Sequence, residues 1–204
     1  MTAKETNMQT MQAYDAIAAD FDRNRSRTGG LEYVDRFCNL VARGGRVLDI
    51  GCGAGIPVTQ RLVSRGFAIV GLDFSARMLE LARKNVPEAA YELADISTWT
   101  PVGRFDGVIA WDSTFHLPPE QHVPVLGKIH GALNLGGLLM MTYGGRKGQV
   151  SSTMFGQTFQ HFALASEEYS AALQQFGFNV IFTEVDDPSS AGHVILCARK
   201  TREK

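Results

Sequence analysis

The sequence predicts an α/β fold: a doubly wound, mostly parallel seven-stranded sheet with an antiparallel last strand and helices on both faces. Three observations predict it. Short apolar runs alternate with amphipathic segments, a glycine-rich turn follows the first apolar run, and the final two runs have only a short link between them. Alternation of this kind is typical of parallel βαβ units. The short link leaves no room for a helical crossover, so the last strand is expected to be antiparallel.

Each element is placed from the spacing of its apolar residues and from the turn signals that flank it. We expect helices at residues 11–25, 31–41, 57–65, 76–85, 120–134 and 167–175. We expect strands at residues 46–50, 68–72, 90–93, 105–111, 137–143, 179–184 and 193–198. The first nine residues are polar, and we expect them to fray. Residues 144–165 are expected to be a long connection whose aromatics either line a binding loop or plug a core edge.

Size and composition predict one domain over residues 1–204. Of the 204 residues, 45% are hydrophobic and 20% are charged, which suits a single α/β unit with a buried core. The formal net charge is -1, from 20 Lys+Arg against 21 Asp+Glu, and this balance disfavours nucleic acid as a partner. We expect a monomer or a homodimer.

The cysteines and the apolar segments predict where the protein works. The three cysteines, Cys38, Cys52 and Cys197, are widely separated and have no metal-ligand spacing, so no metal site is predicted. No apolar signal segment follows Met1, and no apolar run is long enough to span a membrane. We therefore expect a cytoplasmic protein without a membrane partner.

The turn after the first strand and the acid after the second predict a nucleoside site. Doubly wound sheets bind ligands beyond the carboxyl ends of their strands. Glycines let the backbone turn sharply and approach a ligand closely, and Asp73 can accept hydrogen bonds from both hydroxyls of a ribose. The loop has the spacing G-x-G-x-G rather than the G-x-G-x-x-G of dinucleotide sites. Asp49 would repel a pyrophosphate but would suit an amino group and a sulfonium. The alternatives are a tight turn without a ligand and a nicotinamide oxidoreductase.

Five motifs extend this prediction: VLDIGCGAG, VGLDFS, ELADI, FDGVIAWDSTFHL and LGGLLMMTY. With them, residues 11–200 resemble the class I S-adenosylmethionine-dependent methyltransferases of the small-molecule type. The resemblance implies that S-adenosylmethionine is the cofactor and that its methionine part is held by Asp49, Gly51, Cys52, Gly53 and Gly55. It also implies that Asp73 binds the ribose, that Asp95 binds the adenine amino group, and that the adenosine is contacted by Phe74, Met78 and Ile96. Trp111 would line the methyl-donor site, and the helix at 11–25 would be a lid whose Tyr14 meets the cofactor's carboxyl end. Asp95 as a solvated loop acid, Tyr14 as a packing residue, and Met78 and Ile96 as core residues are the alternatives.

Methyl transfer from a sulfonium is an in-line displacement, and a general base helps only if the acceptor arrives protonated. His116 and Asp112, just beyond the fourth strand, are the candidate catalytic residues, with His161 and Tyr143 as weaker candidates. Asp112 could take a proton, orient His116 or bind an amine. A structural histidine and a capping acid are the alternatives. The chain lacks the N-P-P-Y and D-P-P-Y motifs of nucleobase amino methylation, so we expect a small-molecule acceptor. Methylation at oxygen, nitrogen or carbon stays open, as does a cofactor-binding protein without transfer activity.

Overall fold

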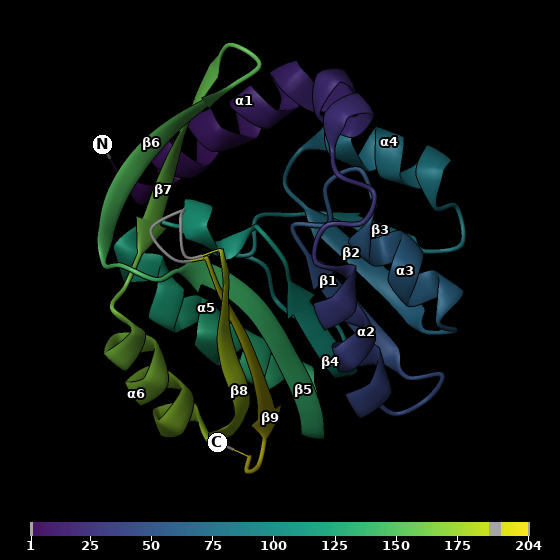
Figure 1. Ribbon diagram of the computed structural model, residues 1–204, viewed down its shortest axis with the longest axis vertical. Helices are drawn as coiled ribbons and strands as arrows, with labels where there is room; N and C mark the ends of the chain where they lie inside the picture. Colours follow the sequence, from purple (N-terminus) through teal and green to yellow (C-terminus); the bar gives the residue numbers. More distant parts are fainter. Residues whose placement is uncertain (1, 188–192, 204) are drawn as a thin grey trace.

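A seven-stranded sheet with the order β3-β2-β1-β4-β5-β9-β8 forms the centre of the computed structural model, which describes residues 2–187 and 193–203 (Figure 1). The strands are β1 (Arg46–Ile50), β2 (Ala68–Asp73), β3 (Ala90–Leu93), β4 (Phe105–Ala110), β5 (Leu133–Gly144), β8 (Phe178–Asp187) and β9 (His193–Lys200). The strands β3, β2, β1, β4 and β5 run parallel to one another. β9 is antiparallel to both β5 and β8, which confirms the predicted antiparallel last strand.

Helices cover both faces of this sheet, as predicted. They are α2 (Leu31–Leu40), α3 (Val58–Ser64), α4 (Ala76–Asn85), α5 (Pro119–Ala132) and α6 (Ser166–Phe176), with a short 3-10 helix η1 (Thr114–His116) after β4. Phe37 of α2 and Leu62 of α3 belong to one buried cluster, which also contains Ile109 of β4. Ile129 of α5 and Leu173 of α6 belong to another. The central strands are therefore buried from both sides, which explains why they are apolar runs without alternation.

The fold differs from the prediction in two places, at the start of the first helix and within the expected long connection (Figure 1). The first helix, α1, spans Ala3–Asn24, so the expectation that the first nine residues fray was wrong. Its start is fixed by a capping box, in which the Thr2 hydroxyl accepts from the Glu5 backbone N–H and the Glu5 carboxylate accepts from that of Thr2. Within the expected long connection, β6 (Gly148–Met154) and β7 (Gln157–Ala163) form an antiparallel hairpin.

The hairpin and α1 pack on one another beside the carboxyl edge of the sheet. Ala13 and Ile17 of α1 form a small buried cluster with Phe159 of β7. A second cluster joins Ala18 of α1 to Met78 of α4. Together α1 and the hairpin cover the side of the sheet to which β1, β2 and β4 point. Among the described residues, no helix is both long and apolar enough to cross a membrane.

Candidate functional site

A cavity of about 270 Å³ lies beyond the carboxyl ends of β1, β2 and β4. Every residue predicted to bind the cofactor lines it except Gly55, and so do the catalytic candidates His116, Asp112 and His161. Among the lining residues that the sequence analysis did not single out are Asn7, Phe21 and Arg25 of the α1 region, Ser113 after β4, and Phe159 of the hairpin. The cavity is therefore built from the strand ends on one side and from α1 and the hairpin on the other.

The glycine loop after β1 adopts backbone angles that favour glycine. Gly51, Gly53 and Gly55 have φ of 70°, 53° and 81°. A Cβ on Gly51 would lie 2.3 Å from the Cβ of Ser113, so the loop and the segment after β4 approach one another closely. Gly55 instead faces α4 and β3, since a Cβ there would meet Val86 at 3.2 Å. Gly55 thus serves the turn and its packing and does not line the cavity.

Two buried carboxyl groups, Asp49 and Asp73, lie beneath this loop. Thr59 donates to Asp49 Oδ2 at 2.6 Å, and the backbone N–H groups of Gly53 and Ser75 donate to Asp73 at 2.9 and 2.8 Å. Burial raises the pKa of Asp49 to about 7, against the Thr59 hydrogen bond, and it raises the pKa of Asp73 to about 6, against the backbone hydrogen bonds. Neither carboxyl has an ion pair within the described part of the chain. The pair therefore favours a ligand that carries positive charge.

The predicted adenosine side of the cavity connects to α1. Asp95 Oδ2 accepts from Asn7 Nδ2 at 2.9 Å, and its Oδ1 accepts from the Ser97 backbone N–H at 2.8 Å. The ring of Phe74 lies 6.3 Å from that of Tyr14. Met78 and Ile96 line the cavity and also pack against buried clusters. These two side chains therefore have both the core contacts and the cavity position that the sequence analysis gave as alternatives.

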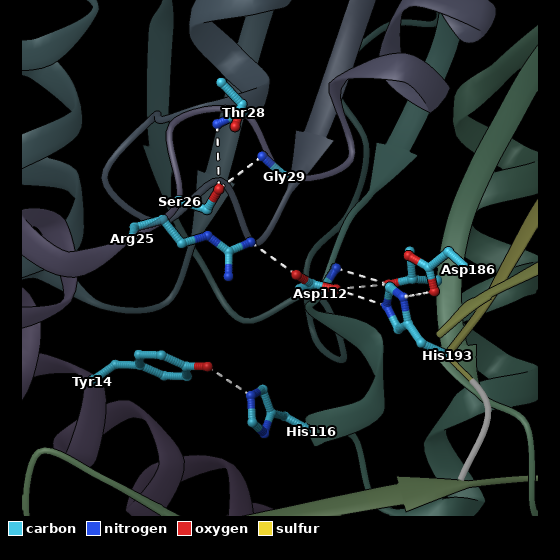
Figure 2. A network of polar contacts seen from close by, with 10 residues as sticks. Tyr14, Arg25, Ser26, Thr28, Gly29, Asp112, His116, Asp186 and His193 are labelled. Atoms are coloured by element: carbon cyan, nitrogen blue, oxygen red, sulfur yellow. Dashed lines mark hydrogen bonds and ion pairs between the residues drawn. The ribbon is translucent and has the colours of Figure 1, made fainter. Parts of the chain in front are cut away.

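Tyr14 and His116 form a hydrogen-bonded pair across the cavity (Figure 2). The Tyr14 hydroxyl lies 2.7 Å from His116 Nε2, and His116 Nδ1 lies 3.0 Å from the backbone carbonyl of Gln160 in β7. Because the carbonyl can only accept, Nδ1 carries the proton and Nε2 accepts from Tyr14. Burial lowers the pKa of His116 to about 4, so the ring is neutral at pH 7. His116 thus joins α1 to the hairpin.

The weaker histidine and tyrosine candidates separate in the structure. His161 of β7 lines the cavity, with its Nε2 2.7 Å from the Ser152 hydroxyl, and its ring packs against those of His116 and Phe115. Tyr143 of β5 is buried against Tyr169 with ring centres 4.3 Å apart, and it does not line the cavity.

Asp112 lies beside Arg25 and His193 rather than with His116 (Figure 2). Its φ is 50°, and its oxygens accept from Arg25 Nη2 at 2.8 Å and from His193 Nε2 at 2.9 Å. His193 Nδ1 also donates to Asp186 at 2.8 Å. Burial disfavours the charge of Asp112, but its hydrogen bonds and charged partners outweigh it and lower the pKa. For His193 the same balance, through Asp112 and Asp186, raises the pKa. Asp112 is an ionised partner of two cations.

Comparisons with known proteins support the cofactor side of this description. Residues 47–137 match a family model described as a methyltransferase domain. Over 96 residues the chain is 36% identical to trans-aconitate 2-methyltransferase of Variovorax paradoxus, covering 46% of this chain and 36% of that protein. Over 109 residues it is 35% identical to an 18S rRNA (guanine-N(7))-methyltransferase of Schizosaccharomyces pombe, covering 48% and 40%. The chain thus spans less than half the length of these relatives.

Solved structures match the fold over almost the whole chain. The 1,6-didemethyltoxoflavin-N1-methyltransferase of Burkholderia thailandensis, solved with S-adenosylhomocysteine, superposes with a TM-score of 0.75 at 18% identity, covering 99% of this chain and 92% of that one. The chain thus resembles the class I S-adenosylmethionine-dependent methyltransferase family in the sequence of residues 47–137 and in its fold. Its family motifs therefore lie on the strand ends that line the cavity.

One further observation tests whether the residues fit the family's cofactor. The Ser113 hydroxyl is buried and has no hydrogen-bond partner within the described residues, although Ser113 lines the cavity. A buried hydroxyl without a partner is costly unless a ligand supplies one. The open hydroxyl, the glycine loop and the two unpaired carboxyls fit a methyltransferase cofactor, which brings polar groups and positive charge to this place.

Proposed function

We propose that this protein transfers the methyl group of S-adenosylmethionine to a small-molecule acceptor by in-line displacement. The observation that carries the proposal is the pair of buried carboxyls, Asp49 and Asp73, which lie without a cationic partner in the described chain beneath a glycine loop. A sulfonium and an amino group would supply the missing positive charge. A pyrophosphate would add negative charge to two carboxylates, which argues against the nicotinamide alternative.

We assign the cofactor's parts along the strand ends. Asp49, the loop of Gly51, Cys52 and Gly53, and the open hydroxyl of Ser113 would hold the methionine part. Asp73 would accept from the ribose hydroxyls. The adenine would lie between strand ends and α1, toward the following residues: Phe74, Met78, Asp95 and Ile96. Trp111 would line the end of the cavity where the methyl group is carried. Gly55 would act on the turn alone.

In this mechanism the protein mainly holds the two reactants in line and keeps water away. The bound cofactor supplies an activated methyl group. Asp112 is a poor base because two donors hold it ionised. His116 Nε2 already accepts from Tyr14, so a base role would require the Tyr14 hydroxyl to move. We therefore assign His116 and Tyr14 to positioning α1 over the cavity.

The covering elements favour a small acceptor. The cavity is bounded by α1 and the hairpin, which bring the apolar side chains Phe21, Met154 and Phe159 beside the polar Asn7, Ser152 and His161. We propose that α1 is a lid and that residues 1–204 act as one domain. The formal net charge of -1 argues against a nucleic-acid acceptor, although one relative acts on rRNA. A cytoplasmic location and a monomeric or homodimeric state belong to the same proposal.

A calorimetric titration of the purified protein with S-adenosylhomocysteine, run beside NAD, tests this function. We expect micromolar binding of the first ligand and none of the second. Labelled methyl donor would then report transfer to added acceptors. Binding of NAD alone would make the protein an oxidoreductase candidate. Binding of S-adenosylhomocysteine with no transfer to any acceptor would favour a cofactor-binding protein that lacks activity.

A further inference from the structure

A second cavity adjoins the first at the end of β4. The two cavities share four lining residues, Arg25, Trp111, Asp112 and Phe115. The second is completed by residues of the α1–α2 connection and of β8 and β9, namely Ser26, Gly29, Gly30, Asp186 and His193. A ligand that enters through the second cavity therefore reaches the expected methyl position at the shared residues.

The charges at this junction leave Arg25 incompletely paired. Asp112 is shared by two cations, since it accepts from both Arg25 and His193. Arg25 uses only Nη2 for this contact, and its Nη1 and Nε have no hydrogen-bond partner within the described chain. Its side chain is 28% exposed. Figure 2 shows a second nitrogen of Arg25 turned toward the side on which the Tyr14–His116 pair lies.

The remaining lining narrows what this guanidinium could bind. Near the junction the walls are the rings of Trp111 and Phe115. Asp49, Asp73 and Asp95 line the donor end of the first cavity, so a molecule with several negative charges would meet repulsion there. An amine would find Asp112 already occupied by two donors. A mostly apolar molecule with one anionic oxygen fits a site that combines this guanidinium, the two aromatic rings and the nearby carboxyl groups.

We propose that the acceptor is an acid with a single ionised oxygen, a carboxylate or a phenolate, and that Arg25 holds this oxygen where the two cavities meet. The inference rests on the proposed methyl transfer. The ionised oxygen would form a bond to the methyl carbon while the carbon–sulfur bond breaks, and that bonding pair would stay on sulfur. An anion and a sulfonium thus give two neutral products, and no proton has to be removed. This agrees with a site in which neither His116 nor Asp112 is available as a base.

The test uses 4-nitrophenol, whose ionised form absorbs visible light, as a probe of the full-length protein loaded with S-adenosylhomocysteine. We expect the probe to bind and its pKa to fall by about one unit in the wild type, a tenfold preference for the phenolate. In Arg25→Met the phenolate should bind at least tenfold more weakly and the pKa of the probe should return to its free value. Arg25→Lys should restore part of the shift.

Two controls separate this inference from the proposed function and from misfolding. Arg27→Met removes a neighbouring arginine that pairs with Asp22 and lines neither cavity, and it should leave the probe unaffected. Each variant should bind S-adenosylhomocysteine within about twofold of the wild type, which shows an intact donor site. If the wild type fails to bind S-adenosylhomocysteine, the proposed function fails. If that ligand binds but the probe does not, binds without a lowered pKa, or binds Arg25→Met equally well, the acceptor inference is overturned.

Discussion

The two sides of the cavity are fixed in different ways. On the donor side, the glycine loop and Asp73 are held by backbone groups at the ends of buried parallel strands, such as the Gly53 N–H donating to Asp73 at 2.9 Å. On the covering side, α1 is attached by hydrogen bonds of its own side chains, such as Tyr14 with His116 and Asn7 with Asp95, and by small apolar clusters. From this difference we propose a donor site that is formed in advance and a cover that can separate from it.

The largest expected effect would test the donor side directly. Replacing Asp73→Ala removes the charged acceptor from the ribose hydroxyls, and we expect a loss on the order of 2–4 kcal/mol in binding free energy for S-adenosylhomocysteine. Calorimetry measures this loss. Asp15→Ala, which removes a partly exposed acid from α1 on the covering side, is the control and should cost far less. Equal affinities for the wild type and Asp73→Ala would contradict the assignment of Asp73 to the ribose. They would also contradict the proposed difference between the donor side and the covering side.

A second substitution would show how closely the donor loop is packed. Gly51→Ala combines a φ of 70° with a Cβ placed 2.3 Å from Ser113, whereas Gly44→Ala has a φ of 69° and no atom within 4 Å. Both variants should be destabilised to a similar extent by the backbone, because alanine is strained in the left-handed conformation. Gly51→Ala should lose about 1–3 kcal/mol more in the free energy of unfolding, because Ser113 must shift. Urea denaturation measures the difference, and similar losses in the two variants would show that the loop has room to adjust.

The pH dependence of stability would report on the buried acids. Burial raises the pKa of Asp49 to about 7, whereas the unfolded value is about 3.9. Between these two pH values the Asp49 carboxyl is therefore ionised mainly in the unfolded state. Asp49 should therefore destabilise the ligand-free protein progressively as the pH rises from about 4 to about 7, with no contribution below that window. Asp49→Asn should remove this contribution, which is about 1.4 kcal/mol of unfolding free energy per pH unit within the window. Denaturation at pH 5 and pH 7.5 compares the two proteins, and parallel slopes would mean that Asp49 ionises normally.

The smallest effect concerns the attachment of the cover. Tyr14→Phe leaves the buried Nε2 of His116 without its donor, and we expect a cost of about 1 kcal/mol. Faster amide exchange in α1 than in the sheet would locate this cost in the cover. Tyr91→Phe is the matched control, because it removes a hydroxyl that donates to the Val86 carbonyl outside the cavity. A uniform change in exchange across the whole protein would show that the cover does not open separately.

The same two sides differ in how far the sequence could predict them. The strands of the sheet and the turn at Gly51 follow from local patterns, since buried runs and glycine spacing are visible within ten residues. The hairpin strand β6 was missed because six of its seven residues are exposed, so it carries no apolar alternation. The start of α1 had a signal that was not used, the Thr2–Glu5 capping box ahead of polar residues.

The polar contacts of the acceptor side could not be predicted in this way. Arg25 and Asp112 are 87 positions apart, and Asp112 and His193 are 81 positions apart. No spacing rule links residues at such separations, and only the folded sheet brings β4 and β9 near the end of α1. The sequence analysis therefore named Asp112 as a functional candidate, with orienting His116 as one of several possible roles, but it could not identify Arg25 and His193 as its partners.

Because of the position of β9, the donor side and the covering side of the cavity can form at different times during synthesis of the chain. β9 follows β8 in the chain but lies between β5 and β8 in the sheet, so β5 keeps an unpaired edge and β8 has no partner strand until residue 200 has left the ribosome. The donor loop, by contrast, needs only β1, β2 and β4, which are complete by residue 110. Since His193 is part of β9, Asp112 receives its second cation only at that late stage. A nascent chain would thus be able to form its cradle for the methyl donor well before its acceptor side exists.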